Sequence, residues 1–130
     1  MNEHAKSSTK TALIVEDSSS MRGLVVSSLE AEGFEVSEAC TGFQAIKELQ
    51  LHPFDLIVTD INMPDLTGLE IIKFARSTDS HEKTPLLVIS TDSESRDKDR
   101  ALALGANHYL VKPFLIDELI RICNELLEEK

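Results

Sequence analysis

The chain has 130 residues, of which 42% are hydrophobic and 28% are charged. This length and composition are typical of one soluble globular domain, and they exclude a disordered chain and a lipid-spanning segment. The 13 Lys and Arg residues face 23 Asp and Glu residues, so the net charge is −10. Because this sign repels a phosphate backbone, we expect no nucleic acid partner.

The first ten residues are polar and lack the apolar centre of a secretory signal. We therefore expect a short polar tail over 1–10, one domain over 11–130, a cytoplasmic location and no membrane insertion. The two cysteines, Cys40 and Cys123, are too few and too far apart to indicate a disulfide framework or a zinc site. We expect both to be reduced and half-buried.

The first strand and helix set the pattern for the chain. The apolar run 12–15 stops at Glu16 and Asp17, as a buried strand does before a helix begins. Apolar residues then fall on one helical face over 19–32, and Gly33 supplies the residue that ends the helix.

The same alternation continues along the chain. Short apolar or alternating runs predict four more strands, at 34–39, 56–58, 85–89 and 107–111. Helical spacing of apolar residues, with capping boxes at Thr41 and Thr67, predicts four more helices, at 41–51, 67–75, 93–104 and 116–127. Imperfect alternation favours an outer position for 34–39, and the polar first half of 93–104 predicts weak docking of that helix. Five strands that alternate with five helices imply a doubly wound α/β fold, in which helices cover both faces of a parallel sheet.

Four of the predicted strands lead into polar residues that can carry chemistry. These residues are Glu16 and Asp17 after the first strand, Asp60 after the third, Ser90 after the fourth and Lys112 after the fifth. In doubly wound sheets, ligands bind beyond the carboxyl ends of the strands. We therefore expect these five side chains to form the functional site.

Three carboxylates at one edge repel each other, and without a cation the pKa of at least one of them would rise. A hard divalent ion removes that conflict, so we expect Mg²⁺ as the cofactor, with Mn²⁺ able to replace it. The expected cluster contains neither Cys nor His, which disfavours zinc. A carboxylate beside Mg²⁺ and a lysine can attack phosphorus and form an acyl phosphate. Ser90 and Lys112 could then hold the phosphoryl oxygens.

The sequence also resembles the receiver domains of two-component response regulators, in particular the CheY-like receivers that consist of a single domain. The resemblance covers residues 11–129 and is carried by one set of motif residues. They are Glu16-Asp17, Asp60 to Asp65, Gly68, Ser90, Leu104 to Ala106, Tyr109 and Lys112 to Phe114. For the fold, the resemblance implies a flavodoxin-like sheet with the strand order 2-1-3-4-5.

The resemblance implies a role for each residue at the acidic edge. Asp60 is the phosphoacceptor, and Lys112 contacts the phosphoryl group. Asp17 is a direct metal ligand, Glu16 is a ligand through water, and Asn62 is a ligand through its backbone carbonyl.

The resemblance also implies a switch. Ser90 and Tyr109 match a pair in which the hydroxyl moves toward the phosphoryl group while the aromatic ring turns inward. The peptide bond between Lys112 and Pro113 is cis in the family, which a turn can accommodate.

Three positions near the site are expected to modulate reaction rates, namely Asn62, Thr91 and Asp92. Two residues depart from the usual pattern of the family. Glu16 precedes Asp17 where a pair of aspartates is common, and Thr91 follows Ser90 where alanine or glycine is usual. Because a β-branched side chain narrows the path to Asp60, our hypothesis is that Thr91 slows turnover.

These implications predict a single-domain response regulator that a sensor histidine kinase phosphorylates on Asp60. The switched surface consists of the helix at 93–104, the strand at 107–111 and the last helix, where Leu115 and Ile122 add apolar area for a downstream target protein. We expect a monomer or a phosphorylation-promoted dimer. Signalling of the chemotaxis or motility type is the favoured pathway.

Other functions stay open on the residues alone. A phosphorelay intermediate would pass its phosphoryl group to a second histidine protein. A phosphatase of the haloacid dehalogenase type needs a second Asp two residues after its nucleophile, where this chain has Asn62, so we expect no enzyme. A flavodoxin-like cofactor site would meet repulsion from Glu16 and Asp17. We expect no effector domain after Lys130, and therefore no direct transcriptional control.

The same residues also have purely structural interpretations. Asp17 is a good helix N-cap, Asp60 and Asn62 suit a turn, and Ser90 could cap the next helix. Tyr109 could be a core residue with a satisfied hydroxyl. The joint occurrence of Asp17, Asp60, Ser90 and Lys112 at four strand ends favours the functional interpretation, whereas the switch role of Tyr109 rests on the resemblance alone. The four histidines show no metal-binding spacing, so none is assigned a function.

Overall fold

The computed structural model describes residues 9–91 and 95–128, in which five strands alternate with five helices. The strands are β1 (Thr11–Val15), β2 (Glu35–Ala39), β3 (Leu56–Asp60), β4 (Leu86–Ser90) and β5 (His108–Val111). The helices are α2 (Ser19–Ala31), α3 (Gly42–Leu51), α4 (Gly68–Arg76), α5 (Ser95–Leu104) and α6 (Ile116–Glu128). Within the described ranges, the helices are too short or too polar to cross a membrane.

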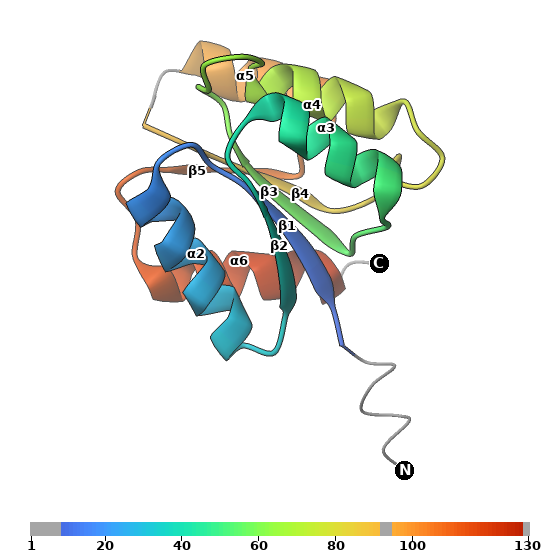
Figure 1. The fold of residues 1–130 in the computed structure, drawn as a ribbon. Coiled ribbons are helices and arrows are strands. Elements are labelled where there is room, and N and C mark those ends of the chain that lie inside the picture. Colours follow the sequence, from blue (N-terminus) through green and yellow to red (C-terminus); the bar gives the residue numbers. More distant parts are fainter. Residues whose placement is uncertain (1–8, 92–94, 129–130) are drawn as a thin grey trace.

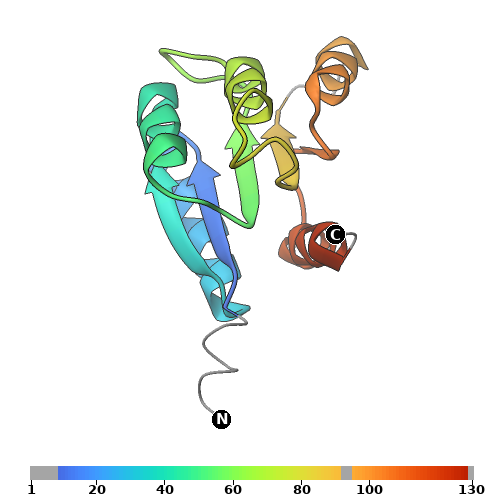
Figure 2. The same ribbon diagram turned by 90° about the vertical axis from the view of Figure 1, so that its right-hand side faces the viewer.

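The five strands form one sheet in the order β2-β1-β3-β4-β5, and every neighbouring pair is parallel. Figures 1 and 2 show α3, α4 and α5 on one face of this sheet and α2 and α6 on the other. The predicted doubly wound fold is therefore confirmed, together with its strand order. Because the strands are parallel, their carboxyl ends lie along one edge, where ligands bind in such folds.

Each face of the sheet has its own apolar core. Successive residues of β1 alternate between the two, because side chains along a strand point to opposite faces. Leu13 and Val15 join the core under α3, α4 and α5, whereas Ala12 and Ile14 join the core under α2 and α6. Full burial of one such large aliphatic side chain stabilises a fold by about 1.5–3 kcal/mol. The strand ends are thus held by a packed scaffold.

The central and outer strands differ in burial. Every residue of β3 and β4 is buried, whereas β2 buries only Ala39. The predicted outer position of β2 is confirmed. Strand β3 continues beyond the apolar run 56–58, because Thr59 and Asp60 still pair with β4. Asp60 is therefore the last residue of a buried strand.

Local hydrogen bonds determine where three helices begin. Thr41 and Thr67 cap α3 and α4 as the capping boxes predicted. Helix α2 is capped by Ser18, whose Oγ accepts a hydrogen bond from the N–H of Met21. The interpretation of Asp17 as the cap of this helix is therefore wrong, and its carboxylate is available for another role.

Two glycines follow helices in the left-handed backbone region, and one of them is Gly33, for which the sequence predicted this role. Gly33 follows α2 with φ of 96°, and Gly105 follows α5 with φ of 120°. Helix α5 is described from Ser95, so the predicted start of the helix at 93–104 and the predicted rate-modulating residue Asp92 lie outside the described residues.

Two side chains of α6 are more buried than predicted. Ile122, expected on the surface, is 1% exposed and packs in the core under α2 and α6. Cys123, expected to be half-buried, is fully buried, and burial raises the pKa of its thiol to about 12. Both lie on the helical stripe that faces the sheet. Cys40 is half-buried as predicted, and both cysteines are free thiols.

Candidate functional site

The carboxyl ends of four strands bring the predicted site residues to one edge of the sheet. Asp60 and Ser90 end β3 and β4, Glu16 and Asp17 follow β1, and Lys112 follows β5. The backbone N–H of Lys112 donates to the carbonyl of Ser90 over 2.7 Å, which fixes the exit of β5 beside the end of β4. Strand pairing therefore sets where each of these side chains begins.

Glu16, Asp17 and Asp60 form an acidic cluster in which one carboxylate oxygen of each residue lies within 4.8 Å of the others. Glu16 and Asp60 are only 1% and 6% exposed, whereas Asp17 is exposed. This set of oxygen donors, two buried and one open to solvent, fits Mg²⁺, because this ion prefers oxygen ligands and retains several water molecules. The three predicted carboxylate ligands therefore lie together.

Lys112 is the counter-ion inside the acidic cluster. Its Nζ lies 2.9 Å from Oε1 of Glu16 and 3.0 Å from Oδ2 of Asp60, and its side chain is 11% exposed. Burial alone would lower the pKa of Lys112, but its hydrogen bonds to Glu16 and Asp60 outweigh burial and raise that pKa. Lys112 is therefore held in its charged form.

Glu16 shows the cost of concentrating charge at this edge. Burial raises the pKa of its carboxyl group, and the nearby charge of Asp60 acts in the same direction. Hydrogen bonds from Lys112 and from the N–H of Ser18 lower the pKa of Glu16 but do not cancel the effect of burial. The cluster thus contains three carboxylates and Lys112, so a further cation at this position would offset negative charge.

Arg22, which had no predicted role, holds the backbone that carries the acidic pair. Its Nη1 donates to the carbonyl of Glu16 over 2.8 Å, and its Nε donates to Oε1 of Glu38 over 3.1 Å. The N–H of Glu16 in turn donates to the carbonyl of Ala39 over 3.0 Å. These contacts tie the end of β1 to α2 and β2. Sequence patterns could not identify them, because a backbone carbonyl is an acceptor at every position.

The loop after Asp60 folds closely against the site. The N–H of Asn62 donates to Oδ1 of Asp60 over 3.2 Å, so the predicted turn geometry coexists with the acidic cluster. The N–H of Gly68 donates to the carbonyl of Ile61 over 2.7 Å, which closes the loop at its far end. A Cβ atom at Gly68 would overlap the carbonyl oxygen of Asp60. Glycine is therefore required where α4 begins.

The predicted switch residues lie on neighbouring strands. Ser90 is fully buried at the end of β4, and Tyr109 on β5 is 7% exposed and packs in the core under α3, α4 and α5. Thr91 directly follows Ser90 and is exposed, so its side chain lies at the surface of this edge. The peptide bond between Lys112 and Pro113 is cis, as predicted.

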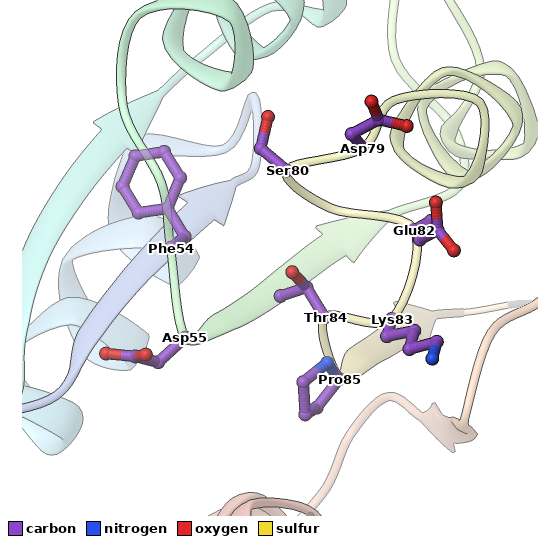
Figure 3. A pocket seen from close by; sticks show the side chains of 8 residues that line it. All are labelled: Phe54, Asp55, Asp79, Ser80, Glu82, Lys83, Thr84 and Pro85. Atoms are coloured by element: carbon purple, nitrogen blue, oxygen red, sulfur yellow. The ribbon is translucent and has the colours of Figure 1, made fainter.

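A separate hollow lies at the opposite edge of the sheet. It has a volume of about 440 Å³ and is lined by Phe54, Asp55 and residues between 79 and 85. Figure 3 shows these side chains around the segments that enter β3 and β4. The hollow therefore lies at the amino ends of the strands, away from the acidic cluster.

Comparisons with known proteins agree with this geometry. The sequence profile of the response regulator receiver domain matches residues 12–124. A probable transcriptional regulatory protein of Picosynechococcus sp. is 36% identical over 134 aligned residues, which cover 97% of this chain and 53% of that protein. The chain thus spans about half the length of the curated relatives that it matches.

Solved structures show the same likeness. The chemotaxis response regulator CheY4 of Vibrio cholerae is 34% identical, with a TM-score of 0.87 over 92% of this chain and 99% of that one. The receiver domain of the sensor histidine kinase PA1611 from Pseudomonas aeruginosa PAO1, which has a magnesium ion coordinated in its active-site cleft, is 26% identical. Its TM-score is 0.85, over 93% of this chain and 99% of that one.

Proposed function

This chain belongs to the response regulator receiver domain family, and from that premise we propose that Asp60 accepts a phosphoryl group from the phosphohistidine of a sensor kinase. Receiver domains act as signalling switches. In this proposal, phosphorylation with Mg²⁺ changes the surface formed by α5, β5 and α6, which then binds a downstream protein. The chain acts as a switch that gains a phosphoryl group on Asp60 and then loses it, and it does not turn over a free substrate.

The observation that carries the proposal is the contact between Lys112 and Asp60. Oδ2 of Asp60 accepts from the ammonium group at 3.0 Å, while Oδ1 accepts from the N–H of Asn62 at 3.2 Å. A buried aspartate with only a structural role would have no need of Glu16 and Asp17 beside it. The crowding of carboxylates instead suits a site that receives a cation and then an anionic group.

The transfer step follows from these positions. An oxygen of Asp60 attacks phosphorus, and the new P–O bond forms as the P–N bond to the donor imidazole breaks. The imidazole leaves with the electron pair and takes up a proton from water. The ammonium group of Lys112 offsets negative charge on the phosphoryl oxygens, and the hydroxyl of Ser90 donates a hydrogen bond to one of them.

The metal proposal rests on the donor set. Glu16, Asp17, Asp60 and the backbone carbonyl of Asn62 would hold Mg²⁺, and all four groups offer the oxygen atoms that this ion prefers. The magnesium-bound receiver domain of PA1611 supports this assignment by analogy. When bound, Mg²⁺ supplies positive charge that offsets the charge of the phosphoryl group.

We assign the link between site and surface to Ser90 and Tyr109, which lie at the end of β4 and on β5. Exposed apolar side chains on the α5–β5–α6 surface suit a protein partner, and they are Leu102, Val111 and Leu115. The likeness to CheY4 supports signalling of the chemotaxis or motility type for this chain.

Chemical labelling tests the proposal. Incubation with acetyl phosphate and Mg²⁺ is expected to add one phosphoryl group per chain, measured by intact mass spectrometry, and chelation of Mg²⁺ is expected to prevent the addition. Asp60→Asn should stay unlabelled, while Asp79→Asn, which changes an exposed aspartate at the opposite edge, should be labelled like the wild type. Labelling of Asp60→Asn to the wild-type level would overturn the assignment. Repeated turnover of small phosphate esters would favour a phosphatase instead.

A further inference from the structure

The loop that follows Asp60 is fastened to a neighbouring helix by one side chain. Oδ1 of Asp65 accepts from the N–H of Gly42 over 2.9 Å, and Oδ2 accepts from the N–H of Phe43 over 2.9 Å. Oδ1 also accepts from the N–H of Leu66 over 2.8 Å. Asp65 therefore joins the loop between β3 and α4 to the first turn of α3, across 23 positions of sequence.

The contact with Asp65 supplies hydrogen-bond acceptors to the first N–H groups of α3. The first N–H groups of a helix have no partners inside the helix and attract an anion. Thr41 accepts from the N–H of Gln44, and Asp65 accepts from the two N–H groups before it. Hydrogen bonds from the N–H of Phe43, and then of Gly42, lower the pKa of Asp65, as expected for a carboxylate at this position.

The loop between β3 and α4 also packs closely against the start of α3. A Cβ atom built on Gly42 would lie 2.5 Å from Cβ of Leu66, so the loop lies directly against the helix start. At its other end, the same loop is closed by the hydrogen bond from Gly68 to Ile61. Asn62 lies between these two attachments, and its N–H donates to Asp60.

We propose that Asp65 is a positioning residue for the metal site, because its carboxylate fixes the loop that presents the backbone carbonyl of Asn62 to the divalent cation. The inference rests on the proposed function, since it concerns the same site. Asp65 does not touch the acidic cluster itself. It acts through the backbone of the loop, and its loss lets the carbonyl of Asn62 move while Glu16 and Asp17 keep their places after β1 and Asp60 keeps its place at the end of β3.

Thr41→Ala supplies the matched control. Thr41 and Asp65 both cap α3, but only Asp65 belongs to the loop that carries Asn62. A purely structural role predicts that loss of either cap lowers the melting temperature and leaves the Mg²⁺ affinity unchanged. A positioning role predicts that the two variants differ in their Kd for Mg²⁺, with weaker binding by the Asp65 variant only.

The experiment is isothermal titration of the full chain with MgCl₂, together with thermal unfolding of each variant. We expect Asp65→Ala to raise the Kd for Mg²⁺ by about tenfold, the lower end of what loss of a supporting contact costs at metal sites. Asp65→Asn keeps one acceptor oxygen and should fall between Asp65→Ala and the wild type. Thr41→Ala should lower the melting temperature without a change in Kd.

Two results overturn the inference in distinguishable ways. If the folded Asp65 variants bind Mg²⁺ like the wild type, Asp65 only caps α3, and the proposed function stands without this inference. If the wild-type chain itself binds no Mg²⁺, the metal-dependent function fails and the inference fails with it.

Discussion

The sheet has a carboxyl edge, where its strands end, and an amino edge, where they begin. Each edge holds a partly buried cation, and the two cations have different partners. At the carboxyl edge, Lys112 contacts the carboxylates of Glu16 and Asp60. At the amino edge, Arg76 donates to the carbonyl of Gly105 from Nε at 3.0 Å and from Nη2 at 2.8 Å. It also donates to the carbonyl of His81 at 2.8 Å and to Oδ1 of Asn107 at 3.1 Å, and all of these acceptors are neutral.

This difference separates a structural network from a functional one. The acceptors around Arg76 are neutral and mostly backbone, so they have fixed positions and no charge left to satisfy. The acidic cluster keeps an excess of negative charge beside Lys112, which a stable fold alone does not require. Helix α4 connects the two edges, because Gly68 at its start packs on Asp60 and Arg76 at its end binds the loop before β5. Variants at the two ends of this helix should therefore have different consequences.

Removal of Arg76 is expected to give the largest loss of stability with the least effect on labelling. Arg76→Ala leaves the carbonyls of Gly105 and His81 without their charged donor, which should lower the free energy of unfolding by about 3 kcal/mol. Urea unfolding measures the loss, and labelling by acetyl phosphate at low temperature should continue. Arg76→Lys is the control: it keeps the charge, loses the planar fork and should recover only part of the stability. A variant as stable as the wild type would show that this network is dispensable.

At the other end of α4, the requirement is for space. Gly68→Ala places a Cβ atom against the carbonyl of Asp60, and overpacking of this kind costs about 1–3 kcal/mol. Because the displaced backbone carries Asp60, labelling should slow as well. Gly23→Ala is the matched control, since a Cβ atom there meets nothing within 4 Å among the described residues and lies inside α2. That change should stabilise the chain by about 0.5–1 kcal/mol. Equal effects of the two substitutions would contradict the steric argument.

His81 makes the amino edge sensitive to pH. Its ring is fully buried, stacks on Phe54 with ring centroids 6.0 Å apart, and accepts a hydrogen bond at Nε2 from the N–H of Phe54 over 3.2 Å. Its Nδ1 has no hydrogen-bond partner within the part of the chain that the structure describes. Burial, and then the charge of Arg76, lowers the pKa of His81. A second proton on this ring would place two donors against each other at Nε2.

The sign of the pH effect follows from the lowered pKa. Below about pH 6.5, the unfolded chain binds a proton at this position that the folded chain does not bind, so stability falls as pH falls through that value. The slope contributed by His81 is at most about 1.4 kcal/mol per pH unit. His81→Gln, which keeps an acceptor but does not titrate, removes this contribution. Unfolding curves of both proteins between neutral and mildly acidic pH measure the contribution of His81 to stability. The raised pKa of Glu16 has the opposite effect on stability, but both proteins share it, so it cancels in the comparison. Parallel curves would exclude His81 as the cause.

The sheet and the strand-end residues could be predicted because they depend on local patterns. Apolar runs and their polar ends determine which residues of a parallel strand reach the edge, and this placed Glu16, Asp17, Asp60, Ser90 and Lys112 together in advance. The exposed position of Ile122 was predicted wrongly, because the orientation of α6 depends on how it packs against α2 and the sheet. A helical stripe shows which residues share a face, and packing decides how wide the buried part is.

The supporting contacts could not be predicted, because their partners are backbone groups. Arg22 binds the carbonyl of Glu16, Arg76 binds that of Gly105, and Asp65 binds N–H groups of α3. Every residue except proline offers such groups, so the sequence carries no mark of which ones are used. Only the placement of loops in three dimensions selects them.

Thr91 should give the smallest effect and tests how open the carboxyl edge is. It follows the buried Ser90 and is itself exposed, so its side chain can obstruct small molecules without being part of the core. Thr91→Ala removes the branched side chain and should raise both the rate of labelling by acetyl phosphate and the rate of label loss by a few fold, with unchanged stability. Thr91→Val keeps the shape without the hydroxyl and should retain the wild-type rates if obstruction is the cause. If Thr91→Val instead behaves like Thr91→Ala, the hydroxyl group and not the bulk controls access to Asp60.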